Sequence, residues 1–258
     1  MFINKISNTK RDTFNQCRLK YRYRYIDRIP EAGSNTDALH FGSYIHKILE
    51  DGVAAETPEE LYKLAEQLKE NYKFASSYTP KIKICLDNFL KFNSKLETKD
   101  MTETVFDVEI KDGITQTGII DRVIRGKNGG LLIIDYKTSK REKTKFDLYN
   151  DKQLMGYAFA AHKLFSCKLE DIVCAHYYPI TNNFVTIKYT GSQIAKYLEN
   201  LINEVWIIRK LKKTEFCAEQ NQFCNWCGYK PYCPLFEDGT IVERRVQEAK
   251  KKKKEKRG

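Results

Sequence analysis

The chain has 258 residues, 41% of them hydrophobic, which is enough for one large domain or two small ones. Its formal net charge is +11, and residues 244–257 supply +7 of it through nine Lys or Arg against two Glu. Because no apolar run approaches the ~20 residues of a membrane span, and residues 1–5 lack the apolar stretch of a signal peptide, we expect a cytoplasmic protein without membrane contact.

The N-terminal third is predicted to be helical. Residues 9–27 form the first predicted helix, in which tyrosines alternate with arginines between Tyr21 and Tyr25. These tyrosines could stack on bases beside phosphate-binding arginines, or they could pack inward, which is the commoner arrangement. Three further amphipathic helices are predicted, over residues 39–53, from Pro58 and from Pro80.

The hydrophobic pattern then changes to the period of two that is typical of strands. Residues 103–110, 115–124 and 131–137 predict a meander, with turns at Asp112-Gly113 and at residues 128–130. A helix over 151–165, strands over 172–179 and 184–189, and a helix over 192–212 complete the pattern. We therefore expect one α/β domain over residues 1–240. The basic tail, residues 241–258, is predicted to be disordered or a solvated helix that attracts polyanions or aids solubility.

Two acids and a lysine stand out within the meander. Leu131 to Ile134 read as a strand buried on both faces, and Asp135 and Lys137 then project from its end on the same side. Asp121 lies in the preceding apolar strand, so a hairpin can bring it beside Asp135. Neighbouring acids repel unless a cation lies between them, and oxygen ligands suit Mg²⁺ or Mn²⁺. The pattern predicts a divalent metal site at which Lys137 assists catalysis.

Three residues on helices could complete this site. His46 lies four residues after Gly42 on one helix face, and it could bind the metal or a phosphate, although a lone helix histidine is usually structural. Gln153 and Tyr157 are also four residues apart, on the helix that follows the strand. They could hold Lys137 or contact DNA, or they could be an ordinary polar helix face.

Cysteines gather near the C-terminus. Without an export signal, thiols and metal ligands are favoured over disulfides. Cys224, Cys227 and Cys233 lie within ten residues, and a four-cysteine site needs one more ligand, either Cys217 or the distant Cys17. Since the second C-x2-C pair that is usual for zinc is missing, the spacing favours an iron–sulfur cluster. Cys85 falls on the apolar stripe of its helix. Cys167 and Cys174 read as small core or surface residues, as does Cys217 if Cys17 is the fourth ligand.

These motifs resemble, in order and rough spacing, the RecB-like branch of the PD-(D/E)xK nucleases. The similarity runs from about residue 7 to residue 236, and the motifs that carry it are residues 42–46, 118–122, 134–138 and 153–157. It implies a restriction-endonuclease-like mixed sheet flanked by helices. It also implies that His46, Asp121, Asp135 and Lys137 form the metal-dependent site, supported by Gln153 and Tyr157. Glu109 is a possible further acid that we leave outside this set.

The cysteines resemble those of the iron–sulfur subset of this branch, which includes CRISPR-associated RecB-like exonucleases and AddB-type nuclease domains. By that resemblance Cys17, Cys224, Cys227 and Cys233 would hold a [4Fe–4S] cluster that joins the N- and C-terminal segments.

The resemblance implies a deoxyribonuclease that uses Mg²⁺ or Mn²⁺ and acts as an exonuclease on single-stranded DNA or DNA ends. It would work in recombination, repair or phage DNA metabolism, in the cytoplasm of a bacterial, archaeal or phage-infected cell. A helicase, a recombination protein or a CRISPR integrase is the expected partner. One alternative is a CRISPR adaptation nuclease that trims spacer precursors. The other is a non-catalytic iron–sulfur DNA-binding module, against which the intact Asp121, Asp135 and Lys137 set argues.

Overall fold

The computed structural model describes residues 4–33, 37–96, 101–139 and 141–255. The chain divides into two compact units, which we call the terminal unit (Met1–Asn35 with Asn203–Gly258) and the central unit (Thr36–Ile202). The expected domain over residues 1–240 is thus shared between two units, one of which combines both ends of the chain. No helix in the described ranges is both long and apolar enough to cross a membrane.

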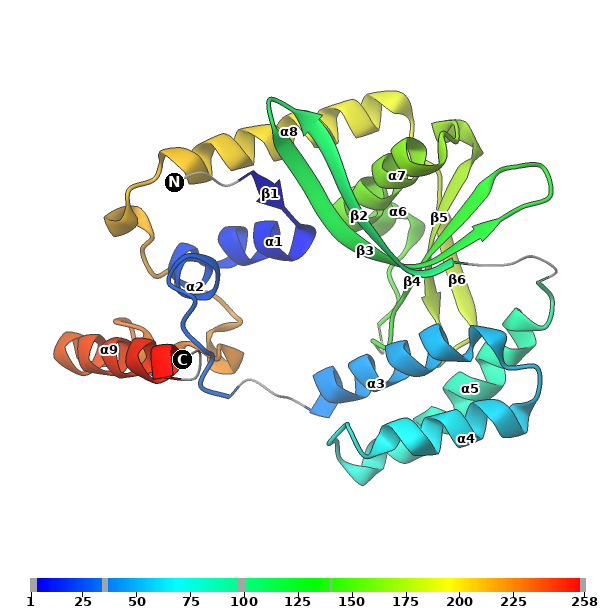
Figure 1. Ribbon diagram of the computed structural model, residues 1–258, viewed down its shortest axis with the longest axis horizontal. Coiled ribbons are helices and arrows are strands. Elements are labelled where there is room, and N and C mark those ends of the chain that lie inside the picture. The colour runs from blue at the N-terminus through cyan, green and yellow to red at the C-terminus, as the bar shows by residue number, and fades with distance from the viewer. Residues whose placement is uncertain (1–3, 34–36, 97–100, 140, 256–258) are drawn as a thin grey trace. The chain divides into compact units, whose positions relative to one another are not determined.

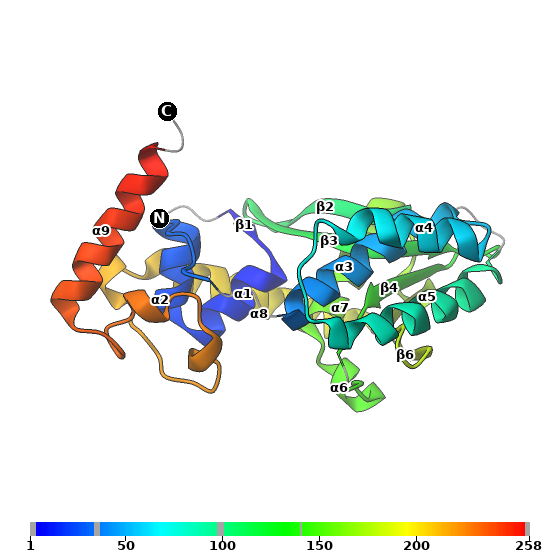
Figure 2. The same cartoon turned by 90° about the horizontal axis from the view of Figure 1, so that it is seen from below.

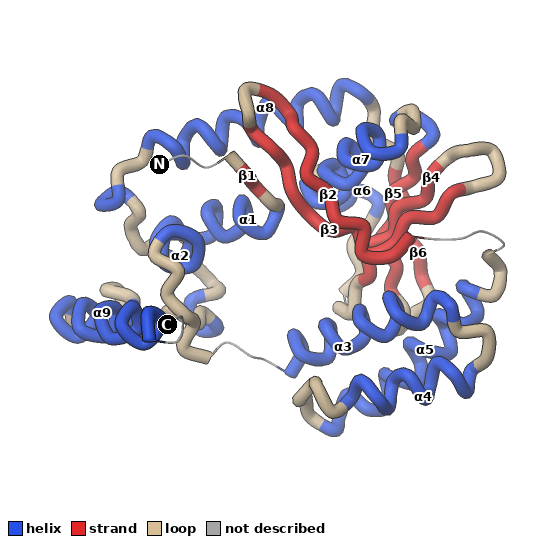
Figure 3. Tube along the Cα trace, viewed as in Figure 1, coloured by secondary structure: helices blue, strands red, loops and turns tan. Residues whose placement is uncertain are grey.

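The central unit is built on a mixed sheet whose strands follow the order β2-β3-β4-β5-β6 (Figures 1 and 3). The first three strands pair antiparallel, as the sequence predicts. β4 then pairs parallel with β5, which pairs antiparallel with β6. The strands are β2 (Met101–Lys111), β3 (Ile114–Arg125), β4 (Leu131–Tyr136), β5 (Ile172–Tyr178) and β6 (Asn183–Ile187).

Helices cover both faces of this sheet. α3, α4 and α5 pack on one face, where Ile134, Tyr136 and Tyr177 of the strands join the core of these helices. α7 packs on the opposite face, where the thiol of Cys174 on β5 donates to the carbonyl oxygen of Leu154. The helices are α3 (Asp37–Asp51), α4 (Pro58–Lys69), α5 (Thr79–Asn93), the short α6 (Lys145–Tyr149), α7 (Lys152–Phe165) and α8 (Gly191–Lys210), which continues into the terminal unit.

The terminal unit begins with helices that Cys17 interrupts. β1 (Lys5–Ile6) and α1 (Asn8–Gln16) precede Cys17, whose backbone is extended at φ −166° and ψ 119°. α2 (Arg18–Tyr21) and a π-helical turn (Arg22–Ile26) follow, so the predicted helix over residues 9–27 is broken in two. Tyr21 and Tyr23 are buried, which matches inward packing rather than an exposed stacking face.

Hydrogen bonds join the two ends of the chain within this unit. The N–H of Leu19 donates to the carbonyl of Cys217 over 3.0 Å, and the hydroxyl of Tyr229 donates to the carbonyl of Ile29 over 2.9 Å. The expected basic tail forms most of α9 (Gly239–Glu255), whose Val242 and Ala249 are buried. This helix differs from a disordered tail because its few apolar side chains have a core to pack against.

Short 3-10 turns connect the remaining elements. They are Gly52–Ala54, Ser76–Tyr78, Leu169–Asp171, Lys213–Glu215, Cys224–Trp226 and Lys230–Tyr232.

A close contact across the β2–β3 hairpin gives a stability prediction. A Cβ atom on Gly118 would lie 2.6 Å from Cζ of Phe106, a buried ring that packs edge-on against Tyr157. We expect Gly118→Ala to lower the free energy of unfolding by about 1–3 kcal/mol, because the Phe106 ring must shift within a packed core. Gly191→Ala is the matched control, since nothing lies within 4 Å of the position that its Cβ would take. Equal stabilities of the two variants in urea unfolding would contradict this packing.

Candidate active site

The two predicted acids stand opposite each other on adjacent strands. Arg122 on β3 pairs with Ile134 on β4, so the next position of this antiparallel pair places Asp121 opposite Asp135. The N–H of Tyr136 donates to Oδ2 of Asp121 over 2.8 Å. The hairpin therefore brings the two carboxylates to the same place, as the sequence predicts.

Burial makes this acid pair electrostatically unfavourable. Asp135 is only 1% exposed, and the side chain of Asp121 is 13% exposed. Burial raises the pKa of Asp121 to about 8, and the neighbouring charge of Asp135 adds to the rise, while the Tyr136 N–H opposes it. A divalent cation between the two carboxylates would remove this cost, so the donor set fits a hard cation with oxygen ligands.

Lys137 is held in place by a chain of polar contacts. Its Nζ lies 2.5 Å from Oδ2 of Asp135 and donates to Oε1 of Gln153 over 3.1 Å. Nε2 of Gln153 in turn donates to the hydroxyl of Tyr157 over 2.9 Å. Burial alone would lower the pKa of Lys137, but the Asp135 carboxylate outweighs it and raises the pKa, so the ammonium stays charged. Gln153 and Tyr157, both on α7, thus orient the lysine.

His46 reaches the acids from α3. Its Nδ1 lies 3.4 Å from Oδ2 of Asp121, and burial lowers the pKa of its imidazole, which favours the neutral form that can bind a metal. Gly42, one turn earlier, lets α3 lie close to the segment that follows β4, because a Cβ there would lie 3.1 Å from Oγ1 of Thr138.

A third acid lies beside the pair and was not predicted. The β2–β3 register places Glu103 opposite Asp121, between the pairs Thr102–Arg122 and Thr104–Ile120. Its backbone has a φ of 46°, a left-handed conformation that is uncommon for glutamate. Burial raises the pKa of Glu103, and its charge adds to the raised pKa of Asp121. Glu109, the acid considered from the sequence, instead accepts from the N–H of Gly113 at the hairpin turn.

His176 is a second unpredicted neighbour. The parallel register pairs it with Asp135, and its fully buried ring places Nε2 3.6 Å from Asp135 and 3.7 Å from Asp151. Burial lowers the pKa of His176 to about 4, so the ring is neutral. Asp151 caps α7 by accepting from the N–H groups of Gln153 and Leu154, which links the acid pair to the helix that orients Lys137.

The four cysteines expected to bind the cluster line one small cavity in the terminal unit. Burial raises the pKa values of Cys227 and Cys233, and the charges of the other cysteines, including Cys17 and Cys224, add to the rise. Cys217 is exposed, whereas Cys85, Cys167 and Cys174 are buried apart from this cavity. The two sequence segments therefore bring these four thiols together.

Within the described residues, no group of three or more His, Cys, Asp or Glu side chains is arranged to hold a single metal ion. At each of the two sites, the carboxylates in one and the cysteines in the other, the donors are thus neighbours but do not form a closed coordination shell.

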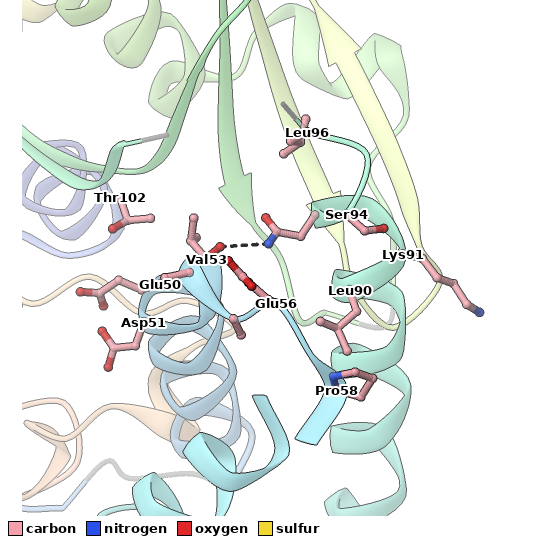
Figure 4. A pocket seen from close by; sticks show the side chains of 13 residues that line it. Glu50, Asp51, Val53, Glu56, Pro58, Leu90, Lys91, Ser94, Leu96 and Thr102 are labelled. Carbon is pink, nitrogen blue, oxygen red and sulfur yellow. Dashed lines mark hydrogen bonds between the residues drawn. The ribbon is translucent and has the colours of Figure 1, made fainter. Parts of the chain in front are cut away.

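An open cavity of about 1210 Å³ in the central unit includes Thr102, the residue before the third acid, in its lining (Figure 4). It is lined by the ends of α3 and α5 and by Thr102 of β2, and the amide of Asn93 donates to the carbonyl of Val53 across its wall. Glu50, Asp51, Glu56 and Lys91 also line it, and Lys47 forms ion pairs with Glu50 and Asp51.

Comparison with protein-family models identifies the superfamily of this chain. The sequence matches the family model of the PD-(D/E)XK nuclease superfamily over residues 5–234, and the chain belongs to that superfamily.

Three proteins from Streptococcus agalactiae, of serotypes Ia, V and III, are similar to part of the chain. Each is named as one of the subunits of an ATP-dependent helicase/deoxyribonuclease. Each is 27% identical over 175 residues, which cover 59% of this chain and 16% of the relative. The matching region therefore spans about a sixth of these relatives. A solved structure titled "Crystal structure of SSO0001" aligns with a TM-score of 0.43 and 17% identity, over 92% of this chain and 89% of that one.

Replacing the Asp121 carboxyl should stabilise the metal-free protein. We expect Asp121→Asn to raise the free energy of unfolding by about 1–3 kcal/mol in EDTA at neutral pH. With a pKa of about 8 the buried carboxyl must take up a proton on folding, whereas the neutral amide does not and keeps the hydrogen bond from Tyr136. Mg²⁺ or Mn²⁺ should raise the melting temperature of the wild type and leave that of the variant unchanged. The exposed Asp171→Asn is the control. A metal-free Asp121→Asn protein less stable than the wild type would contradict the raised pKa of Asp121.

Proposed function

We propose that this protein is a metal-dependent deoxyribonuclease, and specifically an exonuclease on single-stranded DNA in recombination, repair or phage DNA metabolism. The observation that carries the proposal is the buried Asp121–Asp135 pair with Lys137 held beside it by Gln153. Membership of the nuclease superfamily supports hydrolysis of a phosphodiester. The name of the streptococcal relatives supports DNA as the substrate and a helicase as the partner.

Asp121 and Asp135 would hold Mg²⁺ or Mn²⁺, with His46 as a further contact from α3. Two carboxylates are enough for such an ion, which usually keeps waters and binds substrate phosphate at its other positions. Bound there, the ion supplies an activated water and neutralises charge on the phosphate. To accept it, Asp135 must give up part of its contact with the Lys137 ammonium.

Lys137 would then be free to act on the substrate. Its charged Nζ remains tethered to Gln153, so it can donate to a phosphate oxygen that gains charge in the transition state. Tyr157 fixes Gln153, and the raised pKa of Tyr157 keeps its hydroxyl protonated. Neutral His46 can bind the ion or the scissile phosphate.

Cleavage of end-labelled single-stranded DNA tests the proposal. Wild-type protein should cleave it in Mg²⁺ or Mn²⁺ and not in EDTA. Asp135→Asn and Lys137→Met should each lower the rate about 100-fold or more, because the ion or the transition-state charge loses its partner. Covalently closed single-stranded circles should resist cleavage if the enzyme requires ends.

The matched controls are Asp171→Asn and Lys163→Met, which change exposed side chains of the same types and should keep wild-type rates. Metal-dependent activity that survives both Asp135→Asn and Lys137→Met would rule out this site. Rapid cutting of circles would replace the exonuclease assignment with an endonuclease.

We further propose that Cys17, Cys224, Cys227 and Cys233 bind a [4Fe–4S] cluster. Four thiols around one cavity are a suitable donor set, and each cysteine of such a cluster ligates a different iron. Thiolates that raise one another's pKa are stabilised once they bind a cation. The cluster would then reinforce the hydrogen bonds that already join the two ends of the chain.

Anaerobic purification tests the cluster. The wild type should be brown, with a broad visible absorption and about four irons per chain. Cys17→Ser and Cys224→Ser should each lose the colour and lower the melting temperature. Cys217→Ser should retain both, because Cys217 is exposed and does not line the cavity. A colourless wild type with stoichiometric zinc would overturn the assignment.

A further inference from the structure

The short helix α6 presents two exposed aromatic rings that the proposed chemistry does not use. Phe146 is 81% exposed and Tyr149 is 54% exposed. They are three residues apart, and Lys145 is four residues before Tyr149, so the three side chains share one helix face. Phe146 in particular gains little from burial within the protein.

The structure holds this face outward by anchoring the opposite side. Leu148 is fully buried, and the hydroxyl of Tyr189 donates to its carbonyl over 2.6 Å. Thr144 and Asp147 form a capping box that fixes the start of the helix. Figure 2 shows α6 projecting from the central unit. The aromatic face is thus presented on a fixed support.

A cavity of about 870 Å³ adjoins the rings. Its wall includes the exposed side chains of Lys145 and Lys188, and none of the described residues that line it is acidic. Nζ of Lys188 donates to the carbonyl of Glu170 over 2.7 Å, which holds its ammonium near the cavity. The carboxylate of Asp147 is engaged by the N–H and hydroxyl of Thr144 at the start of the helix. The lining therefore combines aromatic and aliphatic side chains with two lysines and no acid among the described residues.

We infer that this surface, defined by Lys145, Phe146, Tyr149 and Lys188, is a base-stacking subsite for single-stranded nucleic acid. Aromatic rings stack on unpaired bases, and neighbouring lysines hold the phosphates. A duplex would not fit this role, because its bases are already stacked inside the helix. Through this subsite, the central unit itself would contribute a preference for single strands.

The subsite lies close enough to the candidate active site to hold the strand being cut. Tyr149 precedes Gln153 by four residues, so their Cα atoms are at most about 14 Å apart. Gln153 contacts Lys137 directly. A base on α6 would therefore belong to a nucleotide only a few positions from the scissile phosphate. The inference rests on the proposed nuclease function for its role in cleavage, although strand binding can be measured without it.

Abasic scanning tests the subsite. The substrates are a series of single-stranded oligonucleotides, and each oligonucleotide carries one abasic position at a different distance from the cleaved bond. For wild-type protein, one position should raise KM by about 5- to 100-fold with little change in kcat, because one stacked base is lost. The Phe146→Ala/Tyr149→Ala double variant should have a similarly raised KM for intact DNA and no such position. Phe146→Tyr/Tyr149→Phe, which keeps both rings, should restore the wild-type profile.

Val105→Ala is the matched control, since Val105 is an apolar side chain on β2 that is 71% exposed and distant in sequence from the subsite. Identical abasic profiles for the wild type and the double alanine variant would overturn the inference. An unchanged profile together with a change in oligomeric state would assign the rings to a protein contact and would equally overturn it.

Binding separates this inference from the nuclease proposal. In EDTA, fluorescence anisotropy with labelled oligo(dT) should give a Kd for the double alanine variant about 5- to 100-fold above that of the wild type and of Val105→Ala. A wild type that binds in this way but never cleaves would refute the nuclease proposal and leave the subsite standing. A wild type that cleaves DNA, together with a double alanine variant that binds as tightly as the wild type, would refute the subsite and leave the nuclease proposal standing.

Discussion

The central constraint in this protein is the burial of two carboxylates side by side. Asp121 and Asp135 face each other across adjacent strands, where burial and mutual repulsion disfavour their charged forms. The surrounding structure supplies partial compensation: a backbone N–H for Asp121 and the Lys137 ammonium for Asp135. Gln153 and Tyr157 then fix the lysine, and the unusual backbone of Glu103 adds a third acid. Such an arrangement costs stability, and the proposed metal ion would offset that cost when it binds between the two carboxylates.

The sequence predicts the centre of this site because the signals there are local. A run of branched aliphatics marks β4, and the Asp112-Gly113 turn fixes the preceding hairpin. The hairpin also places Glu103 opposite Asp121, but counting back from the Asp112-Gly113 turn would have put Thr104 there, because the register shifts by one residue between Glu109 and Lys111. His176 could not be found from local signals either. It meets Asp135 through a parallel pairing of strands separated by two helices, and no local pattern encodes that register.

The terminal unit shows a similar division. The spacing of Cys224, Cys227 and Cys233 indicates a common site, but the residues alone leave the fourth ligand open between Cys17 and Cys217. The structure places Cys17 at the shared cavity and leaves Cys217 exposed. The extended backbone that positions Cys17 interrupts a helix without a proline or glycine at that point, so tertiary contacts and not local propensity determine it. Tertiary contacts also explain α9, because its few apolar residues do not by themselves predict a packed helix.

Sulfur substitution at the scissile phosphate tests whether a metal ion contacts the phosphate that is cut, because Mg²⁺ binds sulfur poorly and Mn²⁺ tolerates it better. The substrate is single-stranded DNA with one stereochemically pure phosphorothioate at the cleaved bond. We expect one diastereomer to be cut far more slowly than normal DNA in Mg²⁺, and we expect Mn²⁺ to restore much of the rate. Equal rates for both diastereomers and normal DNA in Mg²⁺, or inhibition that Mn²⁺ does not relieve, would contradict a metal ion held by Asp121 and Asp135 on the phosphate that is cut.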